Sequence, residues 1–137
     1  MRSLLDTNIL VYADAADEPA KQQRAIELIT TLRGNGTAVL CTQVLQEFVN
    51  VALRKLHLPT SLIRERLTFY GRFELVPTTP ELIANALDLH VLHGLSYYDA
   101  LIVQAGAASG CQFVLSEDMQ HGGVYAGVQI KNPFLVG

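Results

Sequence analysis

Short apolar runs alternate with longer amphipathic segments along this chain. A brief continuous apolar run bounded by turn residues is typical of a buried strand, whereas apolar residues at i, i+3, i+4 and i+7 indicate a helix with one buried face. The Gly34-Asn35-Gly36 turn precedes one such run, and Pro77 ends another. The pattern predicts strands at residues 3–5, 38–41, 73–76, 112–115 and 128–130.

The segments between these runs carry the helical spacing. Residues 25–32 and 45–52 each place four apolar side chains on one helical face. Thr42 is expected to cap the second of these helices, and Thr79 followed by Pro80 is typical of a helix start. Further helices are expected at 60–70, 79–93 and 100–108.

The alternation of strands and helices predicts an α/β fold. Short strands joined by helices form parallel sheets covered on both faces, which gives a three-layer α/β/α architecture. The chain has 137 residues, and no Gly-, Pro- or Ser-rich linker interrupts it. We therefore expect a single domain, residues 1–137.

Composition narrows the class of protein. Hydrophobic residues make up 50% of the chain and charged residues 17%, which excludes a disordered protein. No apolar stretch reaches the roughly 18 residues of a membrane span, and no signal peptide is recognisable, so a cytoplasmic protein is expected. The net charge of -3 argues against a generally basic, nucleic-acid-coating surface. It does not exclude an enzyme that binds nucleic acid through metal ions.

The two cysteines, Cys41 and Cys111, form neither a disulfide framework nor a metal-binding pair of the CxxC type. We expect both to be reduced and to behave as small hydrophobic residues in or near the core.

Candidate chemistry is carried by four acidic residues with apolar flanks: Asp6, Glu47, Asp99 and Asp118. Asp6 and Asp118 follow the first and fourth predicted strands, and functional groups in such sheets collect beyond the carboxyl ends of the strands. Asp99 occupies the first turn of the Ala-rich helix, and Glu47 lies on the helix after the second strand. A cluster of all four at this edge is therefore geometrically possible.

Each acid also has an ordinary structural interpretation. Asp99 forms a capping box with Ser96, and Asp6 could cap a helix that starts near Ile9. Glu47 lies on a polar stripe with Gln43, typical of a solvated helix face, and Asp118 could be a loop acid. The placement of all four acids near one edge of the sheet, rather than any single acid, favours a functional site.

Clustered carboxylates repel one another and take up protons unless a cation neutralises them. Oxygen ligands suit Mg²⁺ or Mn²⁺, and no Cys/His cluster offers a zinc site. Such ions support phosphodiester hydrolysis by activating water and stabilising the attacking and leaving oxygens. The glycine motifs of nucleotide-binding loops and the GxSxG motif of hydrolases are absent from the sequence.

Five segments together resemble the PIN-domain ribonucleases, and more narrowly the VapC-type toxins of toxin–antitoxin pairs. They are LLDTNILVY at the start, QEFVN after the second strand, SYYDALIVQA, LSED after the fourth strand, and the closing QIKNPF. The resemblance covers almost the whole chain.

This resemblance assigns roles to individual residues. It implies that the catalytic residues are Asp6, Glu47, Asp99 and Asp118, with Asp6, Asp99 and Asp118 as metal ligands. Asn8 and Ser116 would support the site. The S-x-D pattern favours Asp118 for the fourth acid, with the adjacent Glu117 as the alternative.

The resemblance further implies a Rossmann-related, five-stranded parallel sheet of order 3-2-1-4-5, a homodimer and an antitoxin partner. We therefore expect a Mg²⁺-dependent endoribonuclease, with Mn²⁺ as a possible substitute, acting on RNA; the alternative is a non-catalytic PIN-like module that binds RNA or protein. RNA binding by a mildly acidic chain would rely on the metal and on local cations, and it should weaken as salt rises. The candidate cations are Arg2, Arg54, Lys55 and Lys131.

Overall fold

A single sheet of six strands forms the centre of the molecule, in the order β3-β2-β1-β4-β6-β5. The computed structural model describes residues 1–135, so the last two residues of the expected 1–137 domain lie outside the described residues. The strands are β1 (Ser3–Leu5), β2 (Ala38–Cys41), β3 (Glu74–Val76), β4 (Phe113–Leu115), β5 (Val124–Tyr125) and β6 (Val128–Lys131).

The five predicted strands are β1, β2, β3, β4 and β6, and they pair in parallel in the predicted order. The expectation of a purely parallel, five-stranded sheet is wrong in one respect, because β5 adds an antiparallel edge strand to β6. The turn between β5 and β6 contains Ala126 and Gly127, both with positive φ. Such turns usually contain Asn-Gly or Asp-Gly, so a turn with Ala126 gave no sequence signal for this hairpin.

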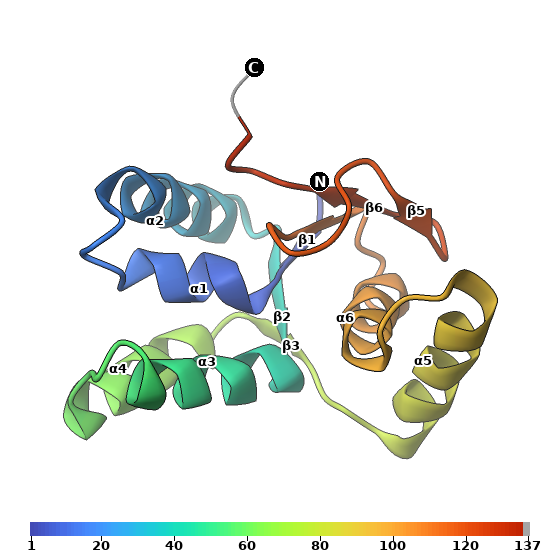
Figure 1. Cartoon of the computed structure of the whole chain (residues 1–137), viewed down its shortest axis with the longest axis horizontal. Coiled ribbons are helices and arrows are strands. Elements are labelled where there is room, and N and C mark those ends of the chain that lie inside the picture. Colours follow the sequence, from blue (N-terminus) through green and yellow to red (C-terminus); the bar gives the residue numbers. More distant parts are fainter. Residues whose placement is uncertain (136–137) are drawn as a thin grey trace.

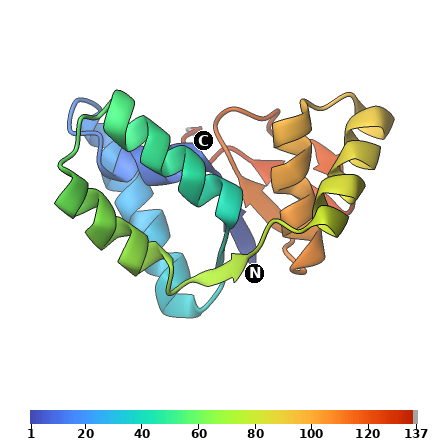
Figure 2. The ribbon, with the colours of Figure 1, turned by 90° about the horizontal axis from the view of Figure 1, so that it is seen from below.

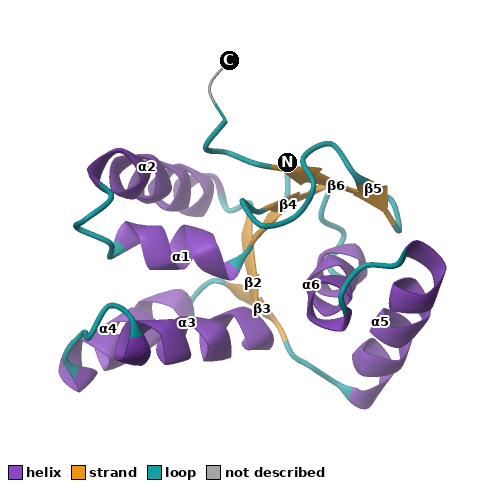
Figure 3. Ribbon diagram, in the orientation of Figure 1, coloured by secondary structure: helices purple, strands orange, loops and turns teal. Residues whose placement is uncertain are grey.

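Helices cover both faces of the sheet and confirm the three-layer fold. The helices α1 to α4 lie on one face, and α5 and α6 lie on the other, as Figures 1 and 2 show from two directions and Figure 3 by type of element. None of the helices within residues 1–135 combines the length and the apolar character needed to cross a membrane. The helices are α1 (Thr7–Ala13), α2 (Pro19–Asn35), α3 (Thr42–Arg54), α4 (Thr60–Tyr70), α5 (Pro80–His93) and α6 (Tyr97–Ala108).

The predicted helix caps differ in outcome. Thr79 caps α5, since its hydroxyl accepts a hydrogen bond of 3.1 Å from the Leu82 N–H. The prediction for Thr42 is wrong: the N-cap of α3 is Cys41, and Thr42 is the first helical residue. The reason is that β2 runs into α3 without a loop, so the last strand residue occupies the cap position.

The pairing of β1 with β4 determines which residues lie side by side at the carboxyl edge of the sheet. Leu5 of β1 is level with Leu115 of β4, and the Asp6 N–H donates to the Leu115 carbonyl at 2.9 Å. The residues that follow these two strands therefore emerge side by side at the carboxyl edge. Cys41, at the same end of β2, is buried, as is Cys111, which confirms that both lie in the core, and neither forms a disulfide in the structure.

Close packing of α6 on the sheet depends on Gly106. A Cβ atom at this position would lie 3.2 Å from Cγ2 of Val114 and 3.8 Å from Cγ1 of Val128. Gly106 thus lets the helix that carries Asp99 approach β4 and β6 closely.

Gly106→Leu is expected to destabilise the protein by about 2 kcal/mol, because the added side chain overpacks a filled interface. Gly34→Leu is the matched control: Gly34 is also helical, and nothing lies within 4 Å of its Cβ position. Urea unfolding of both variants measures the difference. Equal stability of the two variants would contradict the packing argument.

Candidate active site

Asp6 lies at the junction of β1, β4 and α1. Its side chain is 4% exposed. One carboxylate oxygen accepts a hydrogen bond of 2.7 Å from the Thr7 N–H, which caps α1, and the other accepts one of 2.7 Å from the Ser116 hydroxyl. The capping role anticipated for Asp6 is therefore confirmed, and the same side chain contacts the loop after β4.

The surroundings of Asp6 disfavour its charged form. The pKa of Asp6 is raised to about 6, chiefly by burial and to a smaller extent by the negative charges of Glu47 and Asp118. The hydrogen bonds from Ser116 and Thr7 oppose this rise without cancelling it. No basic side chain among the described residues contributes to this balance. Asp6 is thus a buried acid beside two others.

Glu47 faces α1 from the middle of α3. Its two carboxylate oxygens accept hydrogen bonds of 2.6 Å, one from the Thr7 hydroxyl and one from the Gln43 side-chain amide. Gln43 is 6% exposed and also donates to the Tyr98 carbonyl at 3.4 Å. Gln43, on the polar stripe that suggested a solvated face, is therefore buried and contacts Glu47 and the start of α6.

Asp99 lies in the first turn of α6, directly after Tyr98. Its N–H donates to the Ser96 hydroxyl at 3.2 Å, which confirms the helix-capping interaction of this segment. Burial raises the pKa of Asp99, the hydrogen bond with Ser96 lowers it, and the charges of Asp118 and Glu47 raise it. Asp99 therefore lies within electrostatic reach of two of the other predicted acids.

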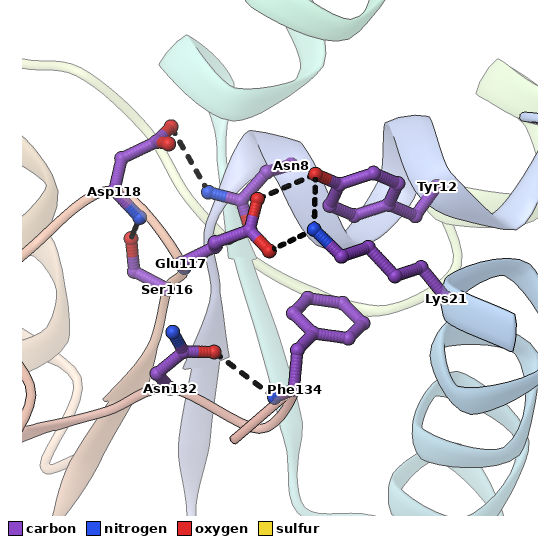
Figure 4. A network of polar contacts seen from close by, with 8 residues as sticks. All are labelled: Asn8, Tyr12, Lys21, Ser116, Glu117, Asp118, Asn132 and Phe134. Carbon is purple, nitrogen blue, oxygen red and sulfur yellow. Dashed lines mark hydrogen bonds and ion pairs between the residues drawn. The ribbon is translucent and has the colours of Figure 1, made fainter. Parts of the chain in front are cut away.

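The two neighbouring acids of the LSED segment point in different directions (Figure 4). Asp118 is exposed, and its carboxylate accepts a hydrogen bond of 3.1 Å from the Asn8 amide. Glu117 instead forms an ion pair of 2.6 Å with Lys21 and accepts a hydrogen bond from the Tyr12 hydroxyl. Asp118, and not Glu117, contributes to the pKa values of Asp6 and Asp99.

A groove of about 460 Å³ lies over this region and is lined in part by α1, α3 and the loop after β4. We call it the α1–α3 groove. Its lining includes Glu47, Asp118 and the basic residue Lys55. His121, in the same loop region as Asp118, accepts from the Asn132 N–H at 3.0 Å.

The donor chemistry of this edge fits a hard divalent cation. The acids at this edge are carboxylates, and Asp6 is buried with only neutral hydrogen-bond donors. A cation would offset both the cost of burying the Asp6 charge and the repulsion between the acids. Within residues 1–135, however, no three acidic, histidine or cysteine side chains lie close enough together to form a ready metal site. The acids are coupled by charge but held apart by separate hydrogen bonds.

Comparison with known proteins identifies the family. A family model for the PIN domain matches residues 3–125. The chain therefore belongs to the PIN-domain family, as the sequence pattern predicted. No curated protein sequence matches the chain.

Solved structures share the fold. A toxin–antitoxin complex from Klebsiella pneumoniae contains a chain that is 16% identical, with a TM-score of 0.71 over 98% of this chain and 99% of that one. VapBC2 from Rickettsia felis, bound to a promoter DNA fragment, gives 19% identity and a TM-score of 0.69 over 96% and 98%. Mycobacterium tuberculosis VapC20, a toxin that cleaves the sarcin–ricin loop, gives 17% and 0.69 over 93% and 98%.

Several polar residues of this region were not singled out as site residues from the sequence. Thr7 and Gln43 had a local signal, since one adjoins Asp6 and the other precedes Glu47 by one helical turn. Tyr12 and Lys21 had none, because they meet Glu117 only through the fold, 105 and 96 residues away along the chain.

The raised pKa of Asp6 predicts an unusual pH dependence of stability in the absence of metal. Below about pH 4 the acid is protonated in both states; between about 4 and 6 only the unfolded chain ionises, so the folded state loses stability as the pH rises. The difference between the ordinary pKa of 3.8 and the folded-state pKa of about 6 corresponds to roughly 3 kcal/mol of stability, which is present below pH 4 and lost as the pH rises through about 6.

Thermal unfolding in EDTA between pH 4 and 8 measures this effect. Asp6→Asn cannot ionise and should unfold with a smaller loss of stability across this range than the wild type. An identical pH profile for the two proteins would contradict the assignment of the titration to Asp6.

Proposed function

We propose that this protein is a metal-dependent endoribonuclease and the toxin of a toxin–antitoxin pair. The observation that carries the proposal is the buried carboxylate of Asp6, which lies in a PIN fold at the carboxyl edge of the sheet and is coupled by charge to Glu47 and Asp118. Burying the charge of Asp6 beside other acids is costly, even though its carboxylate also caps α1, and such an environment suits a cation site.

The residues proposed to hold the cation are Asp6, Asp99 and Asp118, with Glu47 as the fourth catalytic acid. Mg²⁺, or Mn²⁺ in its place, would supply activation of water and stabilisation of the charge that develops on the scissile phosphate. Asn8 and Ser116 are proposed to support the site.

The remaining polar groups of the site orient these acids. The Ser116 hydroxyl donates to Asp6 and accepts from the N–H groups of Asp118 and Met119, at 3.1 and 3.3 Å. It thereby joins the acid after β1 to the loop after β4. Thr7 and Gln43 fix the two oxygens of Glu47 in the same way.

Lys55 is the proposed contact for the RNA backbone, because it lines the groove that also contains Glu47 and Asp118. Two of the other candidate cations have other contacts: Arg2 forms an ion pair with Glu74, and the Lys131 ammonium lies 4.0 Å from the centre of the Phe113 ring. Because the proposed Lys55 contact is with phosphate, RNA binding should weaken as salt rises.

The proposed partners are RNA, an antitoxin protein and a second copy of this chain, and the proposed location is the cytoplasm. This proposal is supported by the shared fold with a chain of a toxin–antitoxin complex, with a chain of a VapBC pair bound to promoter DNA, and with a toxin that cleaves the sarcin–ricin loop.

A non-catalytic PIN-like module that binds RNA or protein is the second candidate. The observation that favours it is that no three potential ligands converge within the part of the chain that the structure describes. A cleavage assay distinguishes the two.

The purified protein should cleave RNA with Mg²⁺ and stop when EDTA is added. Asp6→Asn and Asp99→Asn should each lower kcat/KM by at least about 100-fold, beyond the 10- to 100-fold typical of residues that only support a metal site. Asp88→Asn is the matched control, because Asp88 is an exposed acid on α5 and should leave the rate unchanged.

Circular dichroism would establish that the variants are folded. Metal-independent cleavage, or cleavage that survives both substitutions, would refute the proposed mechanism. Binding of RNA without any cleavage would favour the non-catalytic module.

A further inference from the structure

Glu117 takes part in a polar network outside the group of four acids (Figure 4). Its carboxylate pairs with Lys21 of α2 at 2.6 Å and accepts from the Tyr12 hydroxyl of α1. Lys21 also donates to the Tyr12 oxygen at 3.2 Å. The three side chains form a closed set of contacts between the loop after β4 and both helices. We call this set the Glu117 clamp.

The segment after β6 packs against the Glu117 clamp. The Phe134 ring meets the Tyr12 ring edge-on, with ring centres 5.0 Å apart. The Lys21 ammonium lies 4.8 Å from the Tyr12 ring centre, and Arg24 donates to the Pro133 carbonyl at 3.1 Å. The aromatic rings limit the positions that Lys21 and Tyr12 can adopt, so the partners of Glu117 are held in place.

Asn8 connects this clamp to the neighbouring acid. Its side-chain oxygen accepts from the Glu117 N–H at 3.3 Å, while its amide nitrogen donates to the Asp118 carboxylate at 3.1 Å. Residues 117 and 118 point in different directions from adjacent positions of one turn. A contact that fixes Glu117 toward Lys21 therefore also fixes Asp118 on the opposite side, within reach of Asn8.

We propose that Glu117 is a positioning residue, whose contacts with Lys21 and Tyr12 hold residues 116–119 so that Asp118 is presented to the acidic site. The inference rests on the proposed function for the role of Asp118, but the positioning itself is a property of the folded chain. The clamp thus assigns the two acids of LSED to different tasks: Glu117 anchors the loop and Asp118 serves the site.

Lys21→Met gives the sharpest test, because Lys21 contacts none of the four acids and its loss cannot remove a metal ligand. Hydrogen exchange should quicken on the order of 10-fold at the amides of Asp118 and Met119, which the Ser116 hydroxyl protects in the wild type. Half-saturation by Mn²⁺ should need roughly 10-fold more metal. These two measurements need no activity.

In the cleavage assay, Lys21→Met and Glu117→Gln should each lower kcat by about 10-fold with little change in KM for RNA, as expected of a residue that supports a metal site. The double variant should have the same kcat as either single variant, because both substitutions break the same Lys21–Glu117 contact. A rise in KM alone would instead make Lys21 a phosphate contact and overturn the proposal.

Glu74→Gln is the matched control, since it breaks the exposed Arg2–Glu74 ion pair, which lies apart from this loop. Tyr12→Phe keeps the ring against Phe134 and removes only the hydroxyl that donates to Glu117. It can replace Lys21→Met as the test variant if that protein fails to fold.

The proposal is overturned if the Asp118 and Met119 amides and the Mn²⁺ affinity of Lys21→Met match the wild type. It is also overturned if Glu117→Gln abolishes metal binding while Lys21→Met does not, because Glu117 would then be a ligand. A wild-type protein that cuts no RNA would refute the proposed function, whereas the exchange and Mn²⁺ measurements would still decide the role of Glu117.

Discussion

The hydrogen bond between Asp6 and Ser116 is the contact on which the arrangement of the site depends. It joins the first residue after β1 to the first residue after β4, two strands that are neighbours in the sheet but 110 residues apart in the chain. The bond is buried, and the rest of the site extends from its two ends. Thr7 donates to Asp6 through its N–H and to Glu47 on α3 through its hydroxyl. The Ser116 hydroxyl accepts from the N–H of Asp118 in the loop after β4.

A fold that buries Asp6 in this way holds an unfavourable charge in its interior. Thr7 of α1 and Ser116 after β4 supply hydrogen bonds from neutral donors, which orient the carboxylate but do not neutralise it. The bond to the Thr7 N–H caps α1, but it leaves the cost of burying the charge uncompensated by a cation. This cost is consistent with the proposed cation site, which the acids of the other elements would share.

The sequence was sufficient for the fold class and for the placement of acids near one edge of the sheet, while the roles of these acids remain proposals. Periodicity placed the five parallel strands, and the acids after β1 and β4 could be assigned to one edge because parallel strands end together. The hairpin of β5 was missed because Ala126 occupies a turn position that usually signals itself by Asn or Asp. The roles of Gln43 and Lys21 depend on helices that meet only after folding, so local spacing misjudged the first and was silent on the second.

Calorimetric titration of Mn²⁺ into the protein at pH 6, in two buffers of different ionisation enthalpy, tests most directly whether Asp6 belongs to a metal site. With a pKa of about 6, Asp6 is part-protonated at this pH, so binding should release protons, and Asp6→Asn should lose both the binding and the proton release. Binding of equal strength in Asp6→Asn, or no binding by the wild type, would contradict the account.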